Sequence, residues 1–535
     1  MSKMVPRPAA TLILLRPGAD GIEVLMIQRT KSAVFLGGAH VFPGGSLDAA
    51  DSDLKKRILG APPAEPPSEY HVAAVRECFE EAGVALLCDK NGMQISPSRA
   101  ERLMPYRTRP FVELLEKEDL YIPASELAYY SHWITAPGRS RRFDTRFFVA
   151  VAPEGQEGSH DETETVHHLW ISPREALARG EGGEIELVFA TQHTLRDLMT
   201  FRDPKTALEQ VRLRPAVETN RACWAQGKEG AKLFRRADPQ YFEIHWSDPE
   251  ETGQSSYELV PGLPKRLDRL VTRIIAPNPG MMTGPGTNTY LVGERELAVI
   301  DPGPAIDSHI ERILAEGKDR IRWILCTHTH VDHSPAAAAL KAATGAQLLG
   351  RPAPEGQDAT FAPDRVLSHN DRFIFDGITL RALHTPGHAS NHVCYLLEQT
   401  RMLFTGDHVM QGSTVVINPP DGDMRAYLAS LEMLLAEDLA ILAPGHGYLI
   451  GEPHKEIRRL IAHRLAREHK VLTSLQELGK ASIAELLALT YDDVPPRIHH
   501  VAARSLTAHL EKLVADGAVR ADGARYTLVK SAAAG

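Results

Sequence analysis

The alternation of apolar and polar residues in the first 200 residues predicts a compact α/β unit. Two β-rich apolar runs, residues 10–15 and 22–28, are separated by a Pro- and Gly-containing turn. A helical pattern follows from Glu69 to Gly83, with Ala73, Val75 and Phe79 on its apolar side. Further strands are predicted at 133–135, 143–151 and from 164, and a helix start is predicted at Ser172–Glu175.

The pattern changes twice more along the chain. From residue 201 to 262 it is weak, which indicates a connecting region with some structure of its own. Strand–loop–helix alternation starts near 263, and helices closed by a small hairpin after 453 suggest a winged-helix domain. The predicted domains are therefore 1–200, 201–262, 263–452 and 453–535.

Composition favours a soluble cytoplasmic protein over a membrane or disulfide-rich one. The chain has 43% hydrophobic and 24% charged residues and a net charge of -9. Its apolar run at 11–15 is too short to cross a bilayer, so we expect no membrane association. Its five cysteines are dispersed and include no CxxC pair, which favours reduced thiols.

Four short His/Asp segments in the second half carry the strongest chemical signal: 327–333, 384–388, 405–408 and 444–447. A chain with 24 His places some of them together by chance, but here each segment also contains Gly, Pro or Thr, residues typical of tight loops. The apolar run 321–326 reads as a buried strand that leads into the first segment. Imidazole and carboxylate ligands in this number predict a two-metal hydrolase.

These segments resemble the ligand motifs of the metallo-β-lactamase superfamily. The resemblance implies two Zn²⁺ ions, one held by His328, His330 and His388, the other by Asp332, His333 and His446, with Asp407 bridging both. It also places Asp301 behind the ligands. Asp332 is either the base that accepts a proton from the attacking water or a ligand only. For His384 and His408 we expect supporting or packing roles.

The substrate of this second site is less constrained. Residues 278–280 and 287–292, with the helical tail, resemble the lactamase-β-like group that includes an endoribonuclease acting on single-stranded RNA. This favours RNA phosphodiesters, while thioesterases of the glyoxalase II type, or acting on acyl-coenzyme A, are the alternative because they share nearly the same ligands. The excess of basic residues in the tail suits phosphate contacts or an ordinary solvated face: Arg458, Arg459, Arg464, Arg467 and Lys470.

A second constellation lies on the helix predicted at 69–83. Glu77, Glu80 and Glu81 are related by i, i+3 and i+4, so their carboxylates converge on one face, as a Mg²⁺ or Mn²⁺ site requires. Such a face is often merely solvated. Together with Phe42–Gly45 upstream, however, Arg76 and the three Glu resemble the motif of Nudix hydrolases, which cleave nucleoside diphosphates linked to another group. By that resemblance Glu80 and Glu81 are catalytic, and all three Glu bind metal.

The Nudix resemblance has departures. Residues 51–68 are inserted between the glycines and the helix, and the motif's early Glu has only an offset candidate in Glu69. An inserted motif of this kind resembles the coenzyme A diphosphatase subgroup, although Val34 stands where that subgroup's signature has Arg. The resemblance implies a nucleotide or coenzyme A derivative as ligand. A non-catalytic, nucleotide-binding regulatory module is the alternative for this half.

The sequence thus predicts a multidomain α/β protein: a Nudix α/β/α sandwich, a metallo-β-lactamase αββα sandwich and a small winged-helix domain. It predicts metal-dependent hydrolysis at two sites. A homodimer is compatible with the winged-helix tail, which would then pack or dimerise instead of binding nucleic acid.

Overall fold

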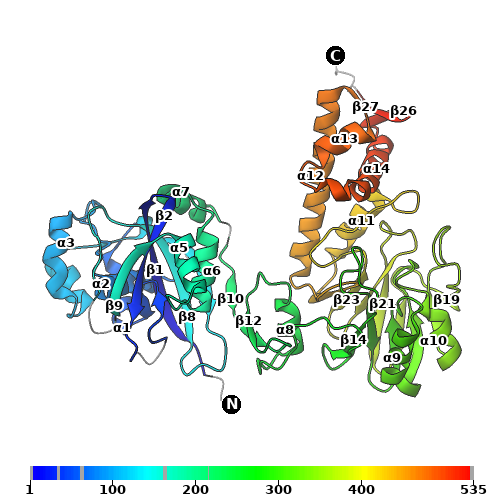
Figure 1. Cartoon of the computed structure of the whole chain (residues 1–535), viewed down its shortest axis with the longest axis horizontal. Helices are drawn as coiled ribbons and strands as arrows, with labels where there is room; N and C mark the ends of the chain where they lie inside the picture. The colour runs from blue at the N-terminus through cyan, green and yellow to red at the C-terminus, as the bar shows by residue number, and fades with distance from the viewer. Residues whose placement is uncertain (1–3, 33–35, 61–64, 161–164, 215, 530–535) are drawn as a thin grey trace. The chain divides into compact units, whose positions relative to one another are not determined.

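The computed structural model describes residues 4–32, 36–60, 65–160, 165–214 and 216–529. Backbone contacts divide the chain into two compact units. Unit 1 comprises the residues up to Ala237 together with Glu251–Gln254, and unit 2 comprises Asp238–Glu250 and the residues from Ser255 onward. Figure 1 shows the elements of each unit in chain colours.

Unit 1 is built on a mixed sheet in the order β10-β7-β8-β1-β2-β3, with β4 paired to β1 and β9 to β2. In β1, Leu12 and Leu14 are buried on one face and Ile13 and Leu15 on the other. This strand is covered on both sides, which explains its continuous apolar sequence. The strands are β1 (Arg7–Gly18), β2 (Gly21–Arg29), β3 (His40–Val41), β4 (Gly44–Ser46), β7 (Ala128–Ile134), β8 (Phe143–Val151), β9 (Thr165–Ile171) and β10 (Thr219–Arg221).

Helices cover both faces of this sheet and make an α/β/α sandwich. Helix α2 (Ser68–Ala82) packs on one face, while α5 (Pro173–Glu181), α6 (Phe189–Leu198) and α7 (Pro204–Arg212) pack on the other. Helix α2 lies within one residue of the predicted range and ends where Gly83 adopts φ +66°, a left-handed cap that favours glycine. Smaller elements complete the unit: α1 (Ala49–Asp53), β5 (Ile58–Leu59), α3 (Pro97–Leu103), α4 (Phe111–Lys117), β6 (Ile122–Pro123), β11 (Cys223–Ala225) and β12 (Lys232–Phe234).

Unit 2 contains two sheets that face each other across an apolar core. A seven-stranded sheet has the order β13 to β19, and a five-stranded sheet the order β20 to β24. Tyr290 and Leu325 of the first sheet meet Tyr395 and Phe404 of the second in this core. The strands are β13 (Lys265–Arg266), β14 (Val271–Ile275), β15 (Asn288–Val292), β16 (Leu297–Ile300), β17 (Ile321–Leu325), β18 (Gln347–Gly350), β19 (Arg365–Val366), β20 (Arg372–Phe375), β21 (Ile378–His384), β22 (Val393–Leu397), β23 (Met402–Gly406) and β24 (Ile441–Pro444).

Helices cover the outer faces of both sheets, giving an αββα sandwich. Helices α9 (Asp307–Gly317) and α10 (Ala336–Thr344) pack on the first sheet. Helices α11 (Met424–Leu434) and α12 (Pro453–Leu478) pack on the second. One short helix, α8 (Tyr241–Ser247), comes from the region between the two predicted hydrolase domains and belongs to unit 2.

The C-terminal part of unit 2 is a small helical domain with a three-stranded sheet in the order β25-β27-β26. Helix α12 joins it to the sandwich, because Ile457 and Leu460 lie in the sandwich core whereas Val471 and Leu475 lie in the helical core (Figure 1). Its other elements are β25 (Lys480–Ser482), α13 (Ile483–Thr490), α14 (His499–Ala515), β26 (Val519–Asp522) and β27 (Arg525–Leu528). Among the described residues, no helix is long and apolar enough to cross a membrane.

Candidate metal centre

The four His/Asp segments meet at one edge of the two facing sheets. Each segment follows the carboxyl end of a strand of the sandwich: β17 leads into 327–333, β21 into 385–388, β23 into Asp407 and β24 into His446. β23 and β24 are buried along their whole length, whereas β17 and β21 also have partly exposed positions. Loops at the ends of packed strands can bring side chains from distant parts of the sequence together.

The first group of candidate ligands consists of three imidazoles. His330 Nδ1 lies 2.9 Å from His328 Nε2 and 3.1 Å from His388 Nε2. Burial and the neighbouring imidazoles lower the pKa of His328 well below its usual value and that of His330 to about 4. These rings are therefore neutral, which is the state that binds a metal ion.

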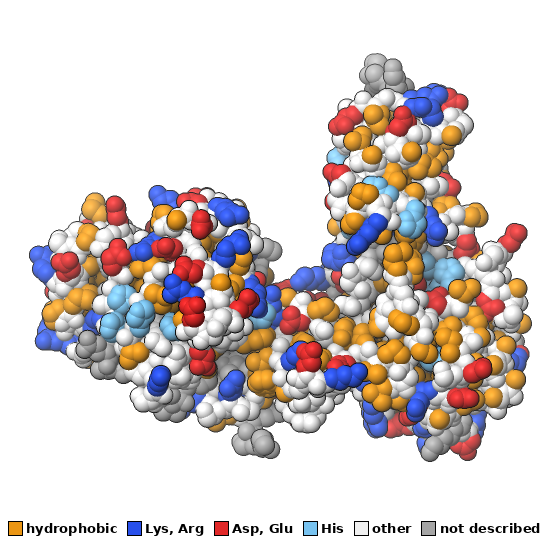
Figure 2. All heavy atoms as spheres, in the orientation of Figure 1, with side chains coloured by type: hydrophobic (Ala, Val, Ile, Leu, Met, Phe, Trp, Pro, Cys, Tyr) orange, Lys and Arg blue, Asp and Glu red, His pale blue; other side chains and the backbone are white. Residues whose placement is uncertain are grey.

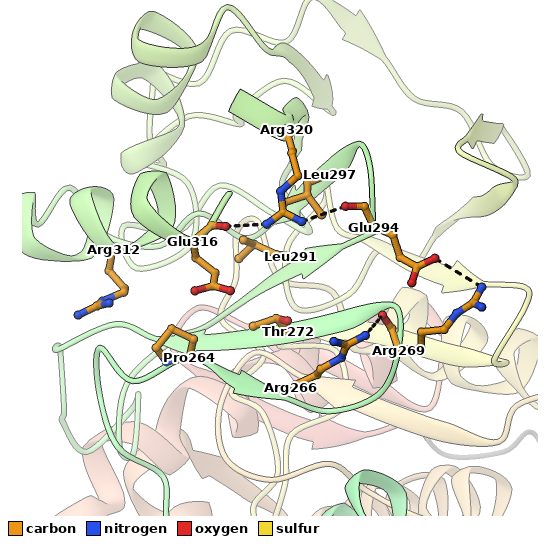
Figure 3. Close-up of a pocket in the computed structure, with 11 residues that line it drawn as sticks. Pro264, Arg266, Arg269, Thr272, Leu291, Glu294, Leu297, Arg312, Glu316 and Arg320 are labelled. Carbon is orange, nitrogen blue, oxygen red and sulfur yellow. Dashed lines mark hydrogen bonds and ion pairs between the residues drawn. The ribbon is translucent and has the colours of Figure 1, made fainter. Parts of the chain in front are cut away.

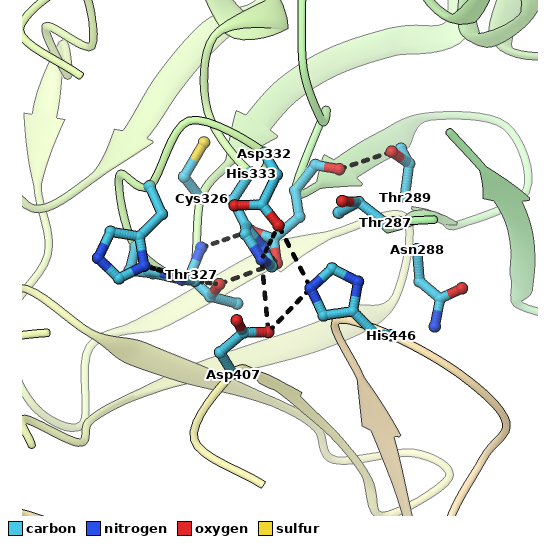
Figure 4. Close-up of polar contacts among 12 residues, drawn as sticks. Thr287, Asn288, Thr289, Cys326, Thr327, Asp332, His333, Asp407 and His446 are labelled. Atoms are coloured by element: carbon cyan, nitrogen blue, oxygen red, sulfur yellow. Dashed lines mark hydrogen bonds and ion pairs between the residues drawn. The ribbon is translucent and has the colours of Figure 1, made fainter. Parts of the chain in front are cut away.

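The second group contains His333, His446, Asp332 and Asp407 (Figure 4). His446 Nε2 lies 3.3 Å from both Asp332 Oδ2 and Asp407 Oδ1, and His333 Nε2 lies 3.4 Å from Asp407 Oδ1. The other oxygen of Asp407, Oδ2, faces His388 Nε2 at 3.8 Å. Asp407 therefore lies between the two groups, as a bridging ligand would.

The donor atoms of the second group fit a cation. Within the described part of the chain, His333 Nε2, His446 Nε2 and Asp407 Oδ1 are buried without a hydrogen-bond partner. Burial alone would lower the pKa of His446, but Asp407 and Asp332 raise it to about 9. A divalent metal site is expected to contain buried carboxylates and imidazoles whose ligand atoms converge and have no hydrogen-bond partner.

Hydrogen bonds from the far side of the rings hold two of the candidate ligands, His333 and His388. Asp301, at φ +52°, accepts from the Thr327 backbone N–H at 2.7 Å, the Thr327 hydroxyl at 2.8 Å and His333 Nδ1 at 2.9 Å. His388 Nδ1 donates to the Val416 carbonyl at 2.8 Å. Such contacts fix ring orientation and tautomer, so Asp301 occupies the supporting place that the sequence predicts.

Close packing also restricts the loop that carries His446. A Cβ at Gly445 would lie 2.7 Å from both Asp407 Oδ1 and His333 Cε1. Only glycine therefore allows this loop to approach the second group.

His384 and His408 lie outside both groups. His384 Nε2 contacts the Ser390 carbonyl, whereas His408 is fully buried and packs against Tyr427. The sequence analysis missed His392, a fully buried ring stacked 5.2 Å from His328. It also missed that the Asn288 side chain donates to the carbonyls of Pro444 and Gly447, on either side of His446. Asn288 belongs to the 287–292 segment that the sequence analysis quotes for its resemblance, but its contact with the His446 loop depends on tertiary structure.

The carboxylates of the Nudix-like motif lie on α2, as predicted, and two of them contact β4, which contains Gly44 and Gly45. Glu81 Oε2 accepts from the Gly44 backbone N–H at 2.8 Å, and a Cβ at Gly45 would lie 2.6 Å from the Glu77 carboxylate. Glu80 is part-buried, and burial raises its pKa. Val34, the departure in the coenzyme A signature, lies outside the described residues.

Arg76 donates to the neighbouring carboxylates of Glu77 at 2.8 Å and Glu80 at 3.1 Å, and it also has a partner in the inserted segment. Asp51 is fully buried and accepts from Arg76 Nε at 2.8 Å and Nη2 at 3.0 Å. Glu69, the offset candidate for the early Glu, pairs instead with Lys55 at 3.0 Å. Glu69 lies in the first turn of α2, and its side chain is engaged with Lys55 and not with Arg76.

A hollow of about 620 Å³ in unit 2 lies apart from these groups (Figure 3). Arginines and glutamates line it, and Arg320 donates to the carbonyls of Glu294 and Glu316. None of the candidate ligands lines this hollow, so the chemistry is not located there.

Comparisons with known proteins agree with this architecture. The family described as metallo-beta-lactamase superfamily matches residues 282–446, the beta-lactamase associated winged helix domain matches 482–526, and the NUDT19 Nudix domain matches 65–192. The chain is 33% identical over 280 residues to an atrochrysone carboxyl ACP thioesterase of Aspergillus chevalieri, covering 49% of this chain and 86% of that protein. It is 32% identical over 281 residues to a beta-lactamase-like protein 2 homolog of Drosophila melanogaster, covering 49% and 93%. The chain belongs to the metallo-beta-lactamase superfamily.

Two other proteins are similar to parts of this chain. Thioesterase pkgB of Emericella nidulans is 35% identical over 240 residues, covering 44% of this chain and 67% of that protein. The chain is also similar in part to a solved NUDIX hydrolase from Alicyclobacillus acidocaldarius, with 30% identity, a TM-score of 0.36, and coverage of 40% of this chain and 99% of that one. The matches confirm the predicted multidomain α/β fold and a hydrolase with Nudix, metallo-beta-lactamase and winged-helix domains. Both hydrolase families imply divalent metal ions. The coenzyme A diphosphatase and endoribonuclease subgroups stay predictions.

Proposed function

We propose that this protein is a two-site metal-dependent hydrolase that cleaves thioesters at a binuclear Zn²⁺ centre in unit 2 and pyrophosphate bonds at a Mg²⁺ or Mn²⁺ site on α2. At the binuclear centre, the ligands are the two groups described above: His328, His330 and His388; Asp332, His333 and His446; with Asp407 between them. When bound, the two ions activate a water molecule and stabilise negative charge on the attacked carbonyl.

The protein's own residues orient this chemistry. Asp301 fixes the ring of His333, and the Val416 carbonyl fixes that of His388. Asp332 is the most accessible member of the second group, with 21% of its side chain exposed against 12% for Asp407. We therefore assign Asp332 the role of accepting the proton of the attacking water as well as that of ligand.

Exposed apolar side chains beside the centre carry the proposal of a thioester. Val331, between the candidate ligands His330 and Asp332, is 74% exposed. Met281 and Met282 are 69% and 50% exposed at the tip of the loop whose Gly286 carbonyl accepts from His446 Nδ1 at 3.2 Å. Apolar side chains that project to solvent beside a catalytic centre favour an acyl chain over the sugar–phosphate backbone of RNA. Two similar proteins, thioesterase pkgB and the atrochrysone carboxyl ACP thioesterase, are named as thioesterases, which supports the same substrate class.

The cations of the tail give RNA less support than their number suggested. Arg467 forms a two-point ion pair with Asp493, Arg459 pairs with Glu456, and Lys470 with Asp492. Arg464 is buried and donates to the Val415 carbonyl. On the face shown in Figure 2, acidic and basic side chains are interspersed over this domain. Cleavage of RNA stays a prediction, as do the cytoplasmic location and a homodimer.

For unit 1 we propose hydrolysis of a nucleotide or coenzyme A derivative. Glu77, Glu80 and Glu81 are grouped on one face of α2 beside β4, which contains Gly44 and Gly45, and Glu80 and Glu81 are the proposed catalytic carboxylates. A single fused protein would then act on both ends of a coenzyme A thioester, cleaving its thioester bond at one site and its pyrophosphate bond at the other.

The test is a substrate panel with matched variants. Zn²⁺- and Mg²⁺-loaded protein is assayed against acyl-coenzyme A, single-stranded RNA and nucleotide sugars. We expect thioester cleavage that Asp332→Asn abolishes and Glu80→Gln leaves intact, and pyrophosphate cleavage with the opposite dependence. Cleavage of RNA with no thioester turnover contradicts the first assignment. Pyrophosphate turnover unchanged by alanine at Glu80 and Glu81 contradicts the second and leaves the regulatory alternative for unit 1.

A further inference from the structure

Helix α8 lies directly against the loop that carries His446, although it precedes that loop by about 200 residues and lies outside the matched superfamily region. Glu243 of α8 is 1% exposed, and its Oε2 accepts from the Leu449 backbone N–H at 3.0 Å. A buried carboxylate that receives a main-chain N–H is a strong and directional contact.

The contact is part of a buried ion cluster. Arg273 of β14 donates to Glu243 through Nη1 at 2.6 Å and Nη2 at 2.8 Å, and its Nη1 also donates to the Gly447 carbonyl at 3.4 Å. Lys265 Nζ contacts Glu243 Oε1 at 2.7 Å. Although burial disfavours the carboxylate, the charges of Arg273 and Lys265 lower the pKa of Glu243 to about 2. Glu243 is therefore charged at neutral pH, and each partner has a fixed place.

Two further contacts extend along the same loop. The Tyr448 hydroxyl donates to the Tyr257 carbonyl at 2.7 Å. A Cβ at Gly451 would lie 2.0 Å from the Phe242 ring, so the ring packs on the bare glycine backbone. The His446 loop is thus held at four residues, 447, 448, 449 and 451. The contacts come from α8, from the segment that follows α8, and from Arg273, which is bound to α8.

The loop is also held from the sheet. Asn288 donates to the carbonyls of Pro444 at 2.9 Å and Gly447 at 3.0 Å. His446 therefore lies on a short stretch of backbone fixed from β15 and from α8. Its position relative to Asp332 and Asp407 depends on both supports, because displacements of about 0.5 Å are enough to weaken a metal site.

We propose that α8 is a brace for the second metal ion and that Glu243 is its positioning residue. The segment between the two hydrolase domains is then required for metal binding at His446. This inference rests on the binuclear centre of the proposed function, and its test measures metal and not turnover.

The experiment compares Glu243→Gln with Lys265→Met in the full chain. Both substitutions remove one charge from the same cluster, but within the described residues Lys265 makes no hydrogen bond to 444–451. Zn²⁺ bound per chain is measured across buffered free Zn²⁺ concentrations, with excess Mg²⁺ present to fill the oxygen ligands of α2. Thermal unfolding of each metal-free variant shows that it is folded.

We expect two Zn²⁺ for the wild type and for Lys265→Met. Glu243→Gln should keep one ion and bind the other about 10- to 100-fold more weakly, the effect typical of contacts behind a ligand. Equal affinities in all three proteins, or equal losses in both variants, overturn the brace. Selective loss of one ion without thioester cleavage by the wild type supports the brace and refutes the proposed substrate. Thioester cleavage by the wild type together with unchanged Zn²⁺ affinity in Glu243→Gln overturns the brace and supports the proposed substrate.

Discussion

Replacing Asp51 with Asn should loosen α2, the helix that presents the proposed catalytic carboxylates of unit 1. Asp51 has no exposed side-chain area and accepts from two nitrogens of Arg76, whose own side chain is 11% exposed. Losing the charge leaves a buried guanidinium with Glu77 and Glu80 as its remaining carboxylate partners, at 2.8 and 3.1 Å. Breaking a buried ion pair costs about 3 to 5 kcal/mol, and these two partners place the effect near 3.

Hydrogen exchange of peptides covering residues 68–82 measures this change. A loss of about 3 kcal/mol corresponds to roughly 100-fold faster exchange where opening is sub-global. The matched control is Glu69→Gln, because Glu69 is 25% exposed and pairs with Lys55 at the surface, so its loss should cost less than about 1 kcal/mol. Mg²⁺ affinity should also fall in Asp51→Asn, since Arg76 then competes for Glu77 and Glu80. Wild-type exchange in Asp51→Asn, or a larger effect in Glu69→Gln, refutes this reasoning.

Three further predictions concern unit 2. Gly445→Ala should abolish thioester cleavage and weaken Zn²⁺ binding, because its Cβ would lie 2.7 Å from Asp407 Oδ1; full activity would contradict the packing. Asp301→Asn should weaken Zn²⁺ binding about 10- to 100-fold in a chelator competition, whereas Asp376→Asn, at a similar φ of +49° but away from the ligands, should not. Because the pKa of Glu243 is lowered to about 2 from an ordinary 4.5, its charge stabilises unit 2 above pH 4.5, and that stability is lost as the pH falls toward 2. Between pH 4.5 and pH 2, the free energy of unfolding measured with urea should fall by roughly 3 kcal/mol less in Glu243→Gln than in the wild type. The same fall in both proteins would contradict the assignment.

Residues whose role follows from local spacing could be predicted from the sequence. The apolar run before His328 is a strand, as predicted, although it is buried only in part, and the i, i+3, i+4 spacing of Glu77, Glu80 and Glu81 places them on one helix face. The ligand segments also contain Gly and Pro, which are typical of loops, so their positions at the ends of strands could be predicted. Which atoms face which ion stays a prediction that the geometry supports.

Residues that act through tertiary contacts could not be predicted. Asp51 lies in α1, where its spacing from Asp48 indicates a helix cap, but nothing in the sequence indicates that it also pairs with Arg76 on α2. Glu243 lies about 30 residues from Arg273 and about 200 from Leu449 in a region with weak periodicity. Its importance arises only when the two sheets bring β14, the His446 loop and α8 together.

The most direct test of the account is a crystal structure of the Zn²⁺-loaded protein with anomalous diffraction measured on both sides of the zinc absorption edge. We predict two neighbouring zinc peaks, one among His328, His330 and His388 and one among Asp332, His333 and His446, with Asp407 contacting both. No peak at these residues, or a single ion that leaves His446 unbound, would contradict a binuclear hydrolase centre.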